Sequence, residues 1–323
     1  MGRFRVVVTD YVFPDLEPEK AILAEVGAEL VAGQCQSKAQ VIELVPGADA
    51  VLNTYYGPID AEVMDAMPDC RIIVRYGVGV DTVDIAAATE RGIMVANVPD
   101  YCVDEVSDHA VAMTLALLRK LAQGDRNVRR GEWSLAPLKP MSRISSLTIG
   151  IIGMGRIGRA IAAKLAPFGA RITYHDPYVE AGTVSGVSAV ELDELYATAD
   201  AIIIQAPSTP QTRHMLDAAA FAAMRRSPVV VNCARGDLID TEALVKALEQ
   251  GRISGASLDV VEDTPPMPLD HALLTLNNVI VTPHSAWFSA DALHSLQRLG
   301  AMEVARVLRG EPAKHLLNPD ALR

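Results

Sequence analysis

The chain has 323 residues, of which 50% are hydrophobic and 21% are charged, a composition that is typical of globular proteins and excludes a disordered one. Its 29 basic and 40 acidic side chains give a formal net charge of −11, whereas a nucleic-acid-binding protein usually carries a basic excess or a basic patch. At the usual ~150 residues per domain, the length predicts two domains.

The cysteines and the N-terminal residues predict a cytoplasmic protein. The four cysteines form neither a CxxC pair nor a disulfide framework, so we expect reduced thiols. Residues 1–10 contain two arginines but lack the apolar stretch of a signal peptide. No apolar run approaches the ~18 residues that span a bilayer, and we therefore expect no membrane partner.

Over the first hundred residues, short β-branched runs alternate with amphipathic stretches of helical period. This alternation predicts βαβ units and a parallel sheet, and the continuous apolar runs predict strands covered by helices on both faces. The predicted strands are residues 5–9, 50–54, 71–75 and 93–96, and the predicted helices are residues 17–26, 59–67 and 83–91.

A second strand-helix unit follows a long apolar helix, predicted over residues 103–121, and an irregular patch over residues 124–146. The patch contains Trp133, Pro137 and Pro140. Beyond it we predict six strands, which makes four strands in the first unit and six in the second. They are residues 148–152, 171–175, 201–205, 229–232, 255–258 and 279–282, with helices at 216–224 and 241–250 and one long C-terminal helix through Leu308.

A glycine motif between a predicted strand and a predicted helix indicates a dinucleotide site. Gly153 allows a tight turn, Gly155 lets the backbone approach a pyrophosphate, and Gly158 lets the helix pack closely on the strand. The N-terminus of the helix then offers free N–H donors and the positive end of its dipole to the phosphates.

Asp176 indicates which dinucleotide is bound. It ends the next strand, 18 residues after Gly158, close to the ~20 expected of an acid that accepts hydrogen bonds from the ribose hydroxyls. A carboxylate there repels a 2′-phosphate, so NAD is predicted in preference to NADP. The alternative interpretation is an acid on a surface loop.

Arg235 and His284 are the predicted catalytic residues because each follows a strand, and ligands bind beyond the carboxyl ends of parallel strands. The planar fork of an arginine matches a carboxylate, although an arginine at a strand end can also be merely solvated. A histidine can exchange a proton with a hydroxyl or a carbonyl near neutral pH. Among the other six histidines, we interpret His109 as a packing residue and place His175 beside the adenosine.

Taken together, these motifs resemble the D-isomer-specific 2-hydroxyacid dehydrogenase family over nearly the whole chain. The stretch from His284 to Ser289 looks closest to the branch of the C-terminal-binding proteins, which are NAD(H)-binding corepressors. The matching segments are residues 77–81, 153–158 with Asp176, 207–212, 232–236, 255–260 and 282–284.

The resemblance implies a flavodoxin-like substrate domain, residues 1–98 plus 288–323, and an inserted Rossmann NAD domain, residues 99–287, with the active-site cleft between them. It implies a homodimer formed through the NAD domain. The substrate carboxylate would meet backbone N–H groups at Val78 and Gly79 as well as Arg235, in a pocket lined by Trp287 and, less securely, Tyr55, Tyr56 and Tyr76. The implied cofactor contacts, beyond the three glycines and Asp176, are Val106, Arg156, Ile157, Ala206, Pro207, Thr212, Cys233, Ala234, Arg235, Asp259 and His284.

One position departs from the family pattern. The family has a glutamate where this chain has Thr264, and that glutamate orients the imidazole and raises its pKa by stabilising the charged form. Either Glu262 or Asp263 takes its place, or His284 works with a less elevated pKa. The leading hypothesis is a working dehydrogenase without a metal; the alternative is an NAD(H)-sensing, corepressor-like binding protein with little turnover.

Overall fold

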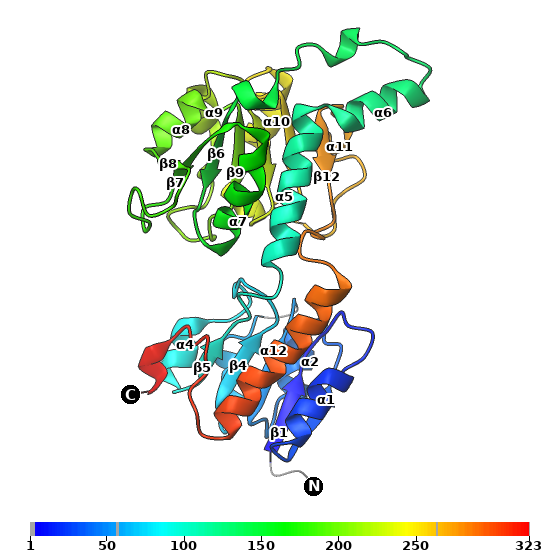
Figure 1. Ribbon diagram of the computed structural model, residues 1–323. Coiled ribbons are helices and arrows are strands. Elements are labelled where there is room, and N and C mark those ends of the chain that lie inside the picture. The colour runs from blue at the N-terminus through cyan, green and yellow to red at the C-terminus, as the bar shows by residue number, and fades with distance from the viewer. Residues whose placement is uncertain (1–3, 56–57, 263, 323) are drawn as a thin grey trace. The chain divides into compact units, whose positions relative to one another are not determined.

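The computed structural model describes residues 4–55, 58–262 and 264–322 and divides the chain into two compact units (Figure 1). Unit 1 comprises Met1–Cys102 and Phe288–Arg323, and unit 2 comprises Val103–Trp287. Each unit contains one parallel sheet, which confirms the predicted fold class. Among the helices of the described residues, none combines the length and the apolarity that crossing a membrane requires.

Unit 1 is a five-stranded sheet in the order β2-β1-β3-β4-β5, with helices on both faces. Helices α1 and α12 pack on one face, and α2, α3 and α4 pack on the other. The strands are β1 Phe4–Val8, β2 Ala28–Ala32, β3 Ala50–Asn53, β4 Ile72–Arg75 and β5 Met94–Ala96. The helices are α1 Glu17–Ala24, α2 Lys38–Leu44, α3 Ala61–Asp65, α4 Ile85–Glu90 and α12 Ala290–Leu308.

Three helices of unit 1 begin at side-chain caps, which explains where these short segments start. Ser37 accepts a hydrogen bond from the backbone N–H of Gln40, Asp60 from that of Val63, and Asp84 from that of Ala87. Each cap satisfies an N–H group that the helix itself cannot pair.

Unit 2 is a seven-stranded sheet in the order β12-β11-β10-β9-β6-β7-β8. The strand order reverses between β6 and β9, and in open parallel sheets such a switch point is where ligands bind. The strands are β6 Thr148–Ile152, β7 Arg171–His175, β8 Ser188–Ala189, β9 Ala201–Ile204, β10 Val229–Asn232, β11 Gly255–Leu258 and β12 Val279–Val281. The helices are α5 Val103–Leu118, α6 Leu121–Arg129, α7 Arg156–Leu165, α8 Leu192–Thr198, α9 Ala218–Ala223, α10 Thr241–Glu249 and α11 Ala272–Thr275.

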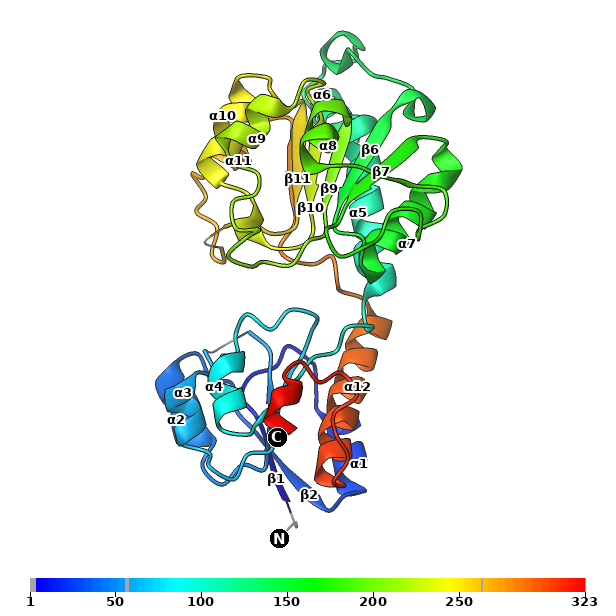
Figure 2. The ribbon, with the colours of Figure 1, turned by 90° about the vertical axis from the view of Figure 1, so that its left-hand side faces the viewer.

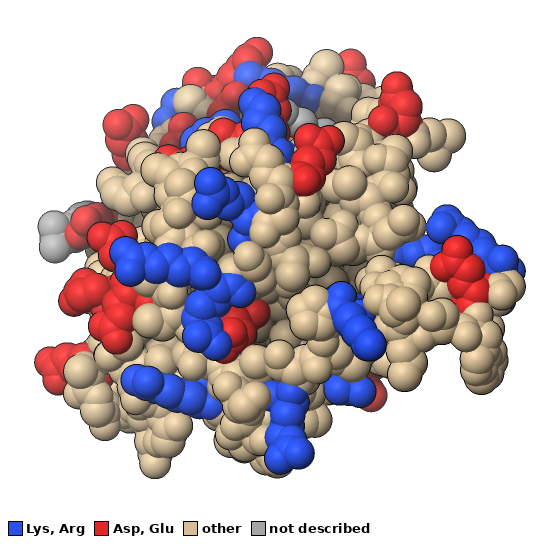
Figure 3. All heavy atoms as spheres, turned by 90° about the horizontal axis from the view of Figure 1, so that it is seen from above, with Lys and Arg blue, Asp and Glu red and all other residues tan. Residues whose placement is uncertain are grey.

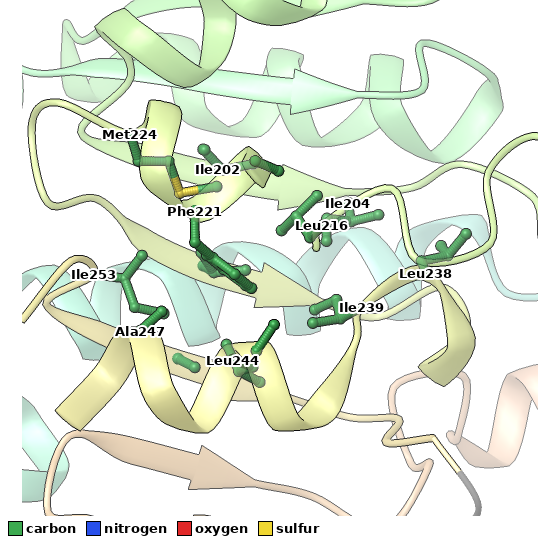
Figure 4. Packing of buried hydrophobic residues seen from close by; sticks show 14 of the residues in the cluster. Ile202, Ile204, Leu216, Phe221, Met224, Leu238, Ile239, Leu244, Ala247 and Ile253 are labelled. Atoms are coloured by element: carbon green, nitrogen blue, oxygen red, sulfur yellow. The ribbon is translucent and has the colours of Figure 1, made fainter. Parts of the chain in front are cut away.

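The helices of unit 2 lie on both faces of its sheet, as Figure 2 shows for α9 and α10 on one side and α5 and α7 on the other. The core on the α9–α10 side is wholly apolar at its centre. Figure 4 shows Phe221 of α9 with Leu244 and Ala247 of α10 gathered over the strand residues Ile202 and Ile204. All five are almost completely buried, so this core fixes the sheet from which the candidate site projects.

Two strands were missed by the sequence analysis, which predicted four and six strands where the structure has five and seven. β2 pairs only with β1, from Phe4↔Ala28 to Val8↔Ala32, and its side chains are half-buried or exposed. β8 has two residues, both exposed, and forms one edge of the unit 2 sheet, with β12 at the other edge. Edge strands lack the continuous apolar run of a central strand, and that run was the signal used.

The first boundary between the units lies after Cys102, four residues beyond the predicted position after Val98. Val98 is buried in the core of unit 1 and donates its backbone N–H to Gly77 O at 3.0 Å. Tyr101 also packs against that core. These contacts hold residues 99–102 in unit 1, and α5 begins immediately afterwards.

The patch that was predicted to be irregular begins as a helix. α6 starts after Lys120, whose backbone is left-handed (φ 51°), and the pair Asp125–Arg129 (2.7 Å) lies one turn apart along it. Figure 1 shows α6 and the segment after it projecting from the sheet of unit 2. Figure 3, which views the molecule of Figure 1 from above, shows basic and acidic side chains interspersed over that face.

Candidate active site

The glycine motif lies where the sequence predicted it, between β6 and α7. Gly153 has a φ of 94°, and a Cβ there would lie 2.6 Å from Gln205 O. A Cβ on Gly158 would lie 2.1 Å from Gly153 O, so only glycine lets the helix approach the strand. A Cβ on Gly155 would meet no atom of the protein within 4 Å.

Gly155 therefore has no packing role within the protein, and its small size suits the close approach of a pyrophosphate. It is also the N-cap of α7, and no side chain caps that end. The first turn of α7, which includes Arg156 and Ile157, therefore presents the positive end of the helix dipole where an anion can bind. The residues present fit a bound dinucleotide.

Asp176 directly follows β7 and is fixed against the glycine turn. Its Oδ2 accepts the N–H of Met154 at 2.7 Å, and its Oδ1 accepts the N–H of Tyr178 at 2.9 Å. The backbone thus holds the carboxylate beside the motif, which makes an unconstrained surface acid the poorer interpretation. His175 forms a hydrogen bond through Nδ1 with Val190 O at 3.2 Å, a contact between strand ends.

The exits of β9 and β10 bring the next group of predicted cofactor contacts to the same edge of the sheet. Ala206 and Pro207 follow β9, and Thr212 closes their loop by donating its hydroxyl to Pro207 O at 2.7 Å. Cys233 follows β10 and is buried beside Met113 of α5. Burial, with a smaller contribution from Asp259, raises the pKa of the Cys233 thiol far above its usual value, so it serves as a neutral packing group.

The turn that carries Arg235 is built by a residue that the sequence analysis did not single out. Asn232 is fully buried; its Nδ2 donates to Arg235 O at 2.8 Å, and its Oδ1 accepts the N–H of Ala234 at 3.0 Å. Gly236 completes the turn, since a Cβ there would lie 2.4 Å from the carbonyl carbon of Val261. A polar residue as the last of a buried strand was the signal that could have revealed Asn232.

Asp259 builds the turn that carries His284. Its carboxylate accepts the hydroxyl of Thr282 at 2.5 Å and the N–H groups of Ser285 and Ala286, both at 2.9 Å. His284 itself has a left-handed backbone (φ 52°), which a non-glycine residue adopts only under constraint. Asp259 was predicted as a cofactor contact, and its bonds show that its carboxylate also shapes this turn.

Glu262 does not provide the carboxylate expected at position 264. Its Oε1 lies 2.6 Å from His214 Nε2 and 2.9 Å from Arg213 Nη2, and its side chain is largely buried. Thr264 donates its hydroxyl to Val261 O at 2.8 Å. Of the two acids considered as substitutes, Glu262 is thus engaged elsewhere, and Asp263 lies outside the described residues.

In unit 1, the predicted substrate loop follows β4. Asn97 donates Nδ2 to Val78 O at 2.6 Å, and Gly77 has a φ of 141°. Gly79 completes the loop. Tyr55 is partly exposed, with the guanidinium carbon of Arg75 5.7 Å from its ring centre. Tyr56 lies outside the described residues, and Trp287 is the last residue of unit 2.

The prediction that Tyr76 lines the substrate pocket is wrong. Its ring is buried against Phe13 and beneath Gly300 of α12, and its hydroxyl donates to Glu19 Oε1 at 2.9 Å. Burial is the main cause of a raised pKa at Glu19, whose other oxygen accepts Gln297 Nε2 at 2.9 Å. Its place next to the substrate loop predicts a lining residue, but strand alternation directs the ring into the core.

Comparison with known proteins gives the same assignment for the family. Residues 111–286 match the model of the NAD-binding domain of D-isomer-specific 2-hydroxyacid dehydrogenases. The chain is 38% identical over 293 residues to a glyoxylate reductase of Korarchaeum cryptofilum, covering 89% of this chain and 88% of that protein. It is 37% identical over 317 residues to a D-3-phosphoglycerate dehydrogenase of Methanocaldococcus jannaschii, covering 97% of this chain but only 59% of that protein.

A solved structure agrees over the whole length. An NADPH-dependent glyoxylate/hydroxypyruvate reductase from Sinorhizobium meliloti, solved with NADP and malonate, has a TM-score of 0.85 and 31% identity, covering 99% of this chain and 98% of that one. That structure is therefore similar to this chain in both fold and sequence.

The glycines of the motif provide a matched pair of variants. We expect Gly155→Ala to leave the stability of the protein unchanged and to raise the dissociation constant for NADH at least ~10-fold, because the added methyl group meets only the cofactor. Gly158→Ala should instead lower the melting temperature, because its methyl group meets Gly153 O. Calorimetry and NADH fluorescence titration measure both effects; equal NADH affinity of Gly155→Ala and the parent would contradict the assigned role.

Proposed function

Since the chain belongs to the D-isomer-specific 2-hydroxyacid dehydrogenase family, we propose that Arg235 binds the carboxylate of a small 2-oxo or 2-hydroxy acid while His284 exchanges the proton. The chain is a nicotinamide-dependent 2-hydroxyacid dehydrogenase. The relatives are named for reactions of this class and differ in substrate. What remains to be proposed for this chain is which residues bind the acid and move the proton, and which acid is the substrate.

The observation that carries the proposal is the fixed placement of both turns. Arg235 and His284 follow β10 and β12, on either side of β11, and Asn232 and Asp259 hold their turns with buried polar bonds. Positioned groups of this kind remove entropy from the barrier before the substrate arrives. A solvated arginine at a strand end would need no such support.

The proton and the carboxylate are handled by different residues. The guanidinium of Arg235 can hold a carboxylate through two parallel hydrogen bonds. A bound nicotinamide supplies or accepts the hydride at its C4. His284 gives a proton to the carbonyl oxygen during reduction and takes one from the hydroxyl during oxidation.

We also propose that the backbone N–H groups of Val78 and Gly79 contact the substrate carboxylate and that Trp287 lines the substrate. Val78 is partly exposed, and Asn97 holds its carbonyl, so the loop is shaped before binding. The Korarchaeum relative is named for glyoxylate. A small 2-oxo acid is therefore the first candidate substrate.

NAD is the proposed cofactor in preference to NADP, although the Sinorhizobium structure contains NADP. The support for this choice is Asp176, whose carboxylate two backbone N–H groups hold beside the glycine turn. A fixed negative charge there accepts ribose hydroxyls and repels a 2′-phosphate.

Thr264 keeps a second candidate function open. Without a carboxylate at that position, an imidazole loses electrostatic support for its charged form. An NAD(H)-sensing, corepressor-like protein would tolerate this loss, because it needs little turnover. The resemblance to the C-terminal-binding-protein branch stays a prediction, and the retained pair Arg235 and His284 favours the enzyme.

The proposal is tested with NADH and a panel of 2-oxo acids. We expect NADH oxidation with glyoxylate, hydroxypyruvate or a bulkier 2-oxo acid, faster than with NADPH, and followed by absorbance. His284→Ala should lower kcat on the order of 10²- to 10⁴-fold. Arg235→Lys should mainly raise KM for the acid, because the charge remains and the fork is lost. Tight NADH binding without turnover across the panel would support the sensor instead.

Position 264 gives a prediction of pH dependence. We expect Thr264→Glu to move the histidine-linked limb of the kcat/KM profile upward by about one pH unit, because a nearby carboxylate stabilises the imidazolium. The matched control is Thr264→Gln, which adds similar bulk without charge and should leave the limb in place. If the histidine-linked limb of the kcat/KM profile does not move in Thr264→Glu, another carboxylate already lies beside His284.

We also propose that the protein forms a homodimer through unit 2. The support is the segment from Leu121, where α6 begins, to Leu138. In this segment the side chain of Trp133 is 88% exposed and that of Leu135 is 74% exposed. Apolar side chains clustered on a projecting segment are typical of an interface.

The dimer is tested by sedimentation velocity. Trp133→Asp with Leu135→Asp should weaken dimerisation on the order of 100-fold or more, since each buried side chain of this kind contributes roughly 1.5–3 kcal/mol. Leu269→Asp, at an exposed leucine outside this segment, is the control and should leave the dimer intact. A monomeric parent protein would contradict the proposal.

A further inference from the structure

His109 of α5 contacts the turn that carries His284. Its Nε2 lies 3.2 Å from Thr282 Oγ1 and 3.7 Å from Asp259 Oδ1. Its side chain is mostly buried, with 26% exposed. His109 was predicted to be a packing residue, but these contacts are polar and join α5 to the end of β12.

Counting donors fixes the direction of the bonds in this group. The hydroxyl of Thr282 has one hydrogen, and it points to Asp259 Oδ1 at 2.5 Å. A carboxylate can only accept, and that of Asp259 also receives the N–H groups of Ser285 and Ala286. Thr282 Oγ1 can therefore only accept from His109, so His109 carries its hydrogen on Nε2.

We propose that His109 is a positioning residue for His284. A chain of hydrogen bonds runs from His109 Nε2 to the Thr282 hydroxyl and on to the Asp259 carboxylate. That carboxylate holds the two N–H groups that follow His284, and the His284 N–H donates to Asp259 O at 2.9 Å. The chain thereby sustains the left-handed backbone of His284 (φ 52°).

The hydrogen-bond chain bears on the reaction because it begins at His109 on α5. His109 lies one helical turn after Val106, the predicted nicotinamide contact on α5. The hydrogen-bond chain therefore connects the helix that would touch the hydride-carrying ring to the turn that would carry the proton. Thr264 donates its hydroxyl to Val261 O. The inference rests on the proposed role of His284.

The test compares substitutions of His109 whose side chains place an N–H donor at different distances from the backbone or have no donor. Glutamine can place an amide N–H near the position of Nε2, whereas asparagine reaches only as far as Nδ1. We expect His109→Leu and His109→Asn to lower kcat about 10- to 100-fold, because a small misplacement of a reacting group has effects of this size. His109→Gln should recover most of the loss. KM for glyoxylate and the dissociation constant for NADH should change by less than about twofold, since neither Arg235 nor the glycine motif is disturbed.

Variants at Thr282 test the chain itself. Thr282→Val removes the relay hydroxyl and should lower kcat as much as His109→Leu does, whereas Thr282→Ser should retain activity. The double variant should be no worse than either single one, because both remove the same link. His294→Leu, at an exposed histidine of α12, is the matched control and should have the kcat of the parent.

Two results separate failure of this inference from failure of the proposed function. If His284→Ala abolishes turnover while His109→Leu keeps the kcat of the parent, the positioning role is overturned and the function stands. If His284→Ala retains turnover, the proposed function fails first. Equal activities of the folded His109→Gln and His109→Asn proteins would also overturn the inference, because the donor at Nε2 would then be irrelevant; this comparison holds even if His109→Leu does not fold.

Discussion

Parallel, in-register pairing of β10, β11 and β12 is the constraint on which the candidate site depends. Asn232 pairs with Leu258, and Leu258 pairs with Val281, so the last residues of β10, β11 and β12 lie level with one another. Every segment that leaves these strands must then start at the same edge of the sheet. The turn of Arg235, Asp259 and the turn of His284 are brought together by the backbone before any side chain acts.

Register alone does not orient the side chains, and both units solve this problem with buried polar groups at strand exits. In unit 2, Asp259 accepts N–H groups from the turn after the neighbouring strand. In unit 1, Asp10 follows β1 and accepts the N–H groups of Thr54 and Tyr55 after β3. Both carboxylates are 2% exposed. A buried carboxylate is stable only when donors surround it, so each one dictates the shape of the adjacent loop.

The sequence allowed the central strands, the glycine motif and the pairing of Asp176 with it to be predicted, because each leaves a local signal. Apolar runs mark buried strands, and glycine at fixed spacing marks a close approach. The edge strands β2 and β8 leave no such run. The roles of Asn232 and Asp259 depend on which loop lies beside them in space, which no local pattern contains. Tyr76 was misplaced for a different reason: it continues the alternation of Ile72 and Val74, which directs its ring into the core, where its hydroxyl donates to Glu19 of α1.

The substitution at position 264 separates two functions that a single carboxylate would otherwise combine. Such a carboxylate both orients an imidazole and stabilises its charge. Here Asp259 and its partners shape the backbone around His284, and Glu262 is committed to His214 and Arg213. The backbone around His284 can therefore be held without a carboxylate at position 264. The departure from the family pattern thus concerns the charge beside the imidazole, and the bonds that hold the backbone of His284 do not depend on residue 264.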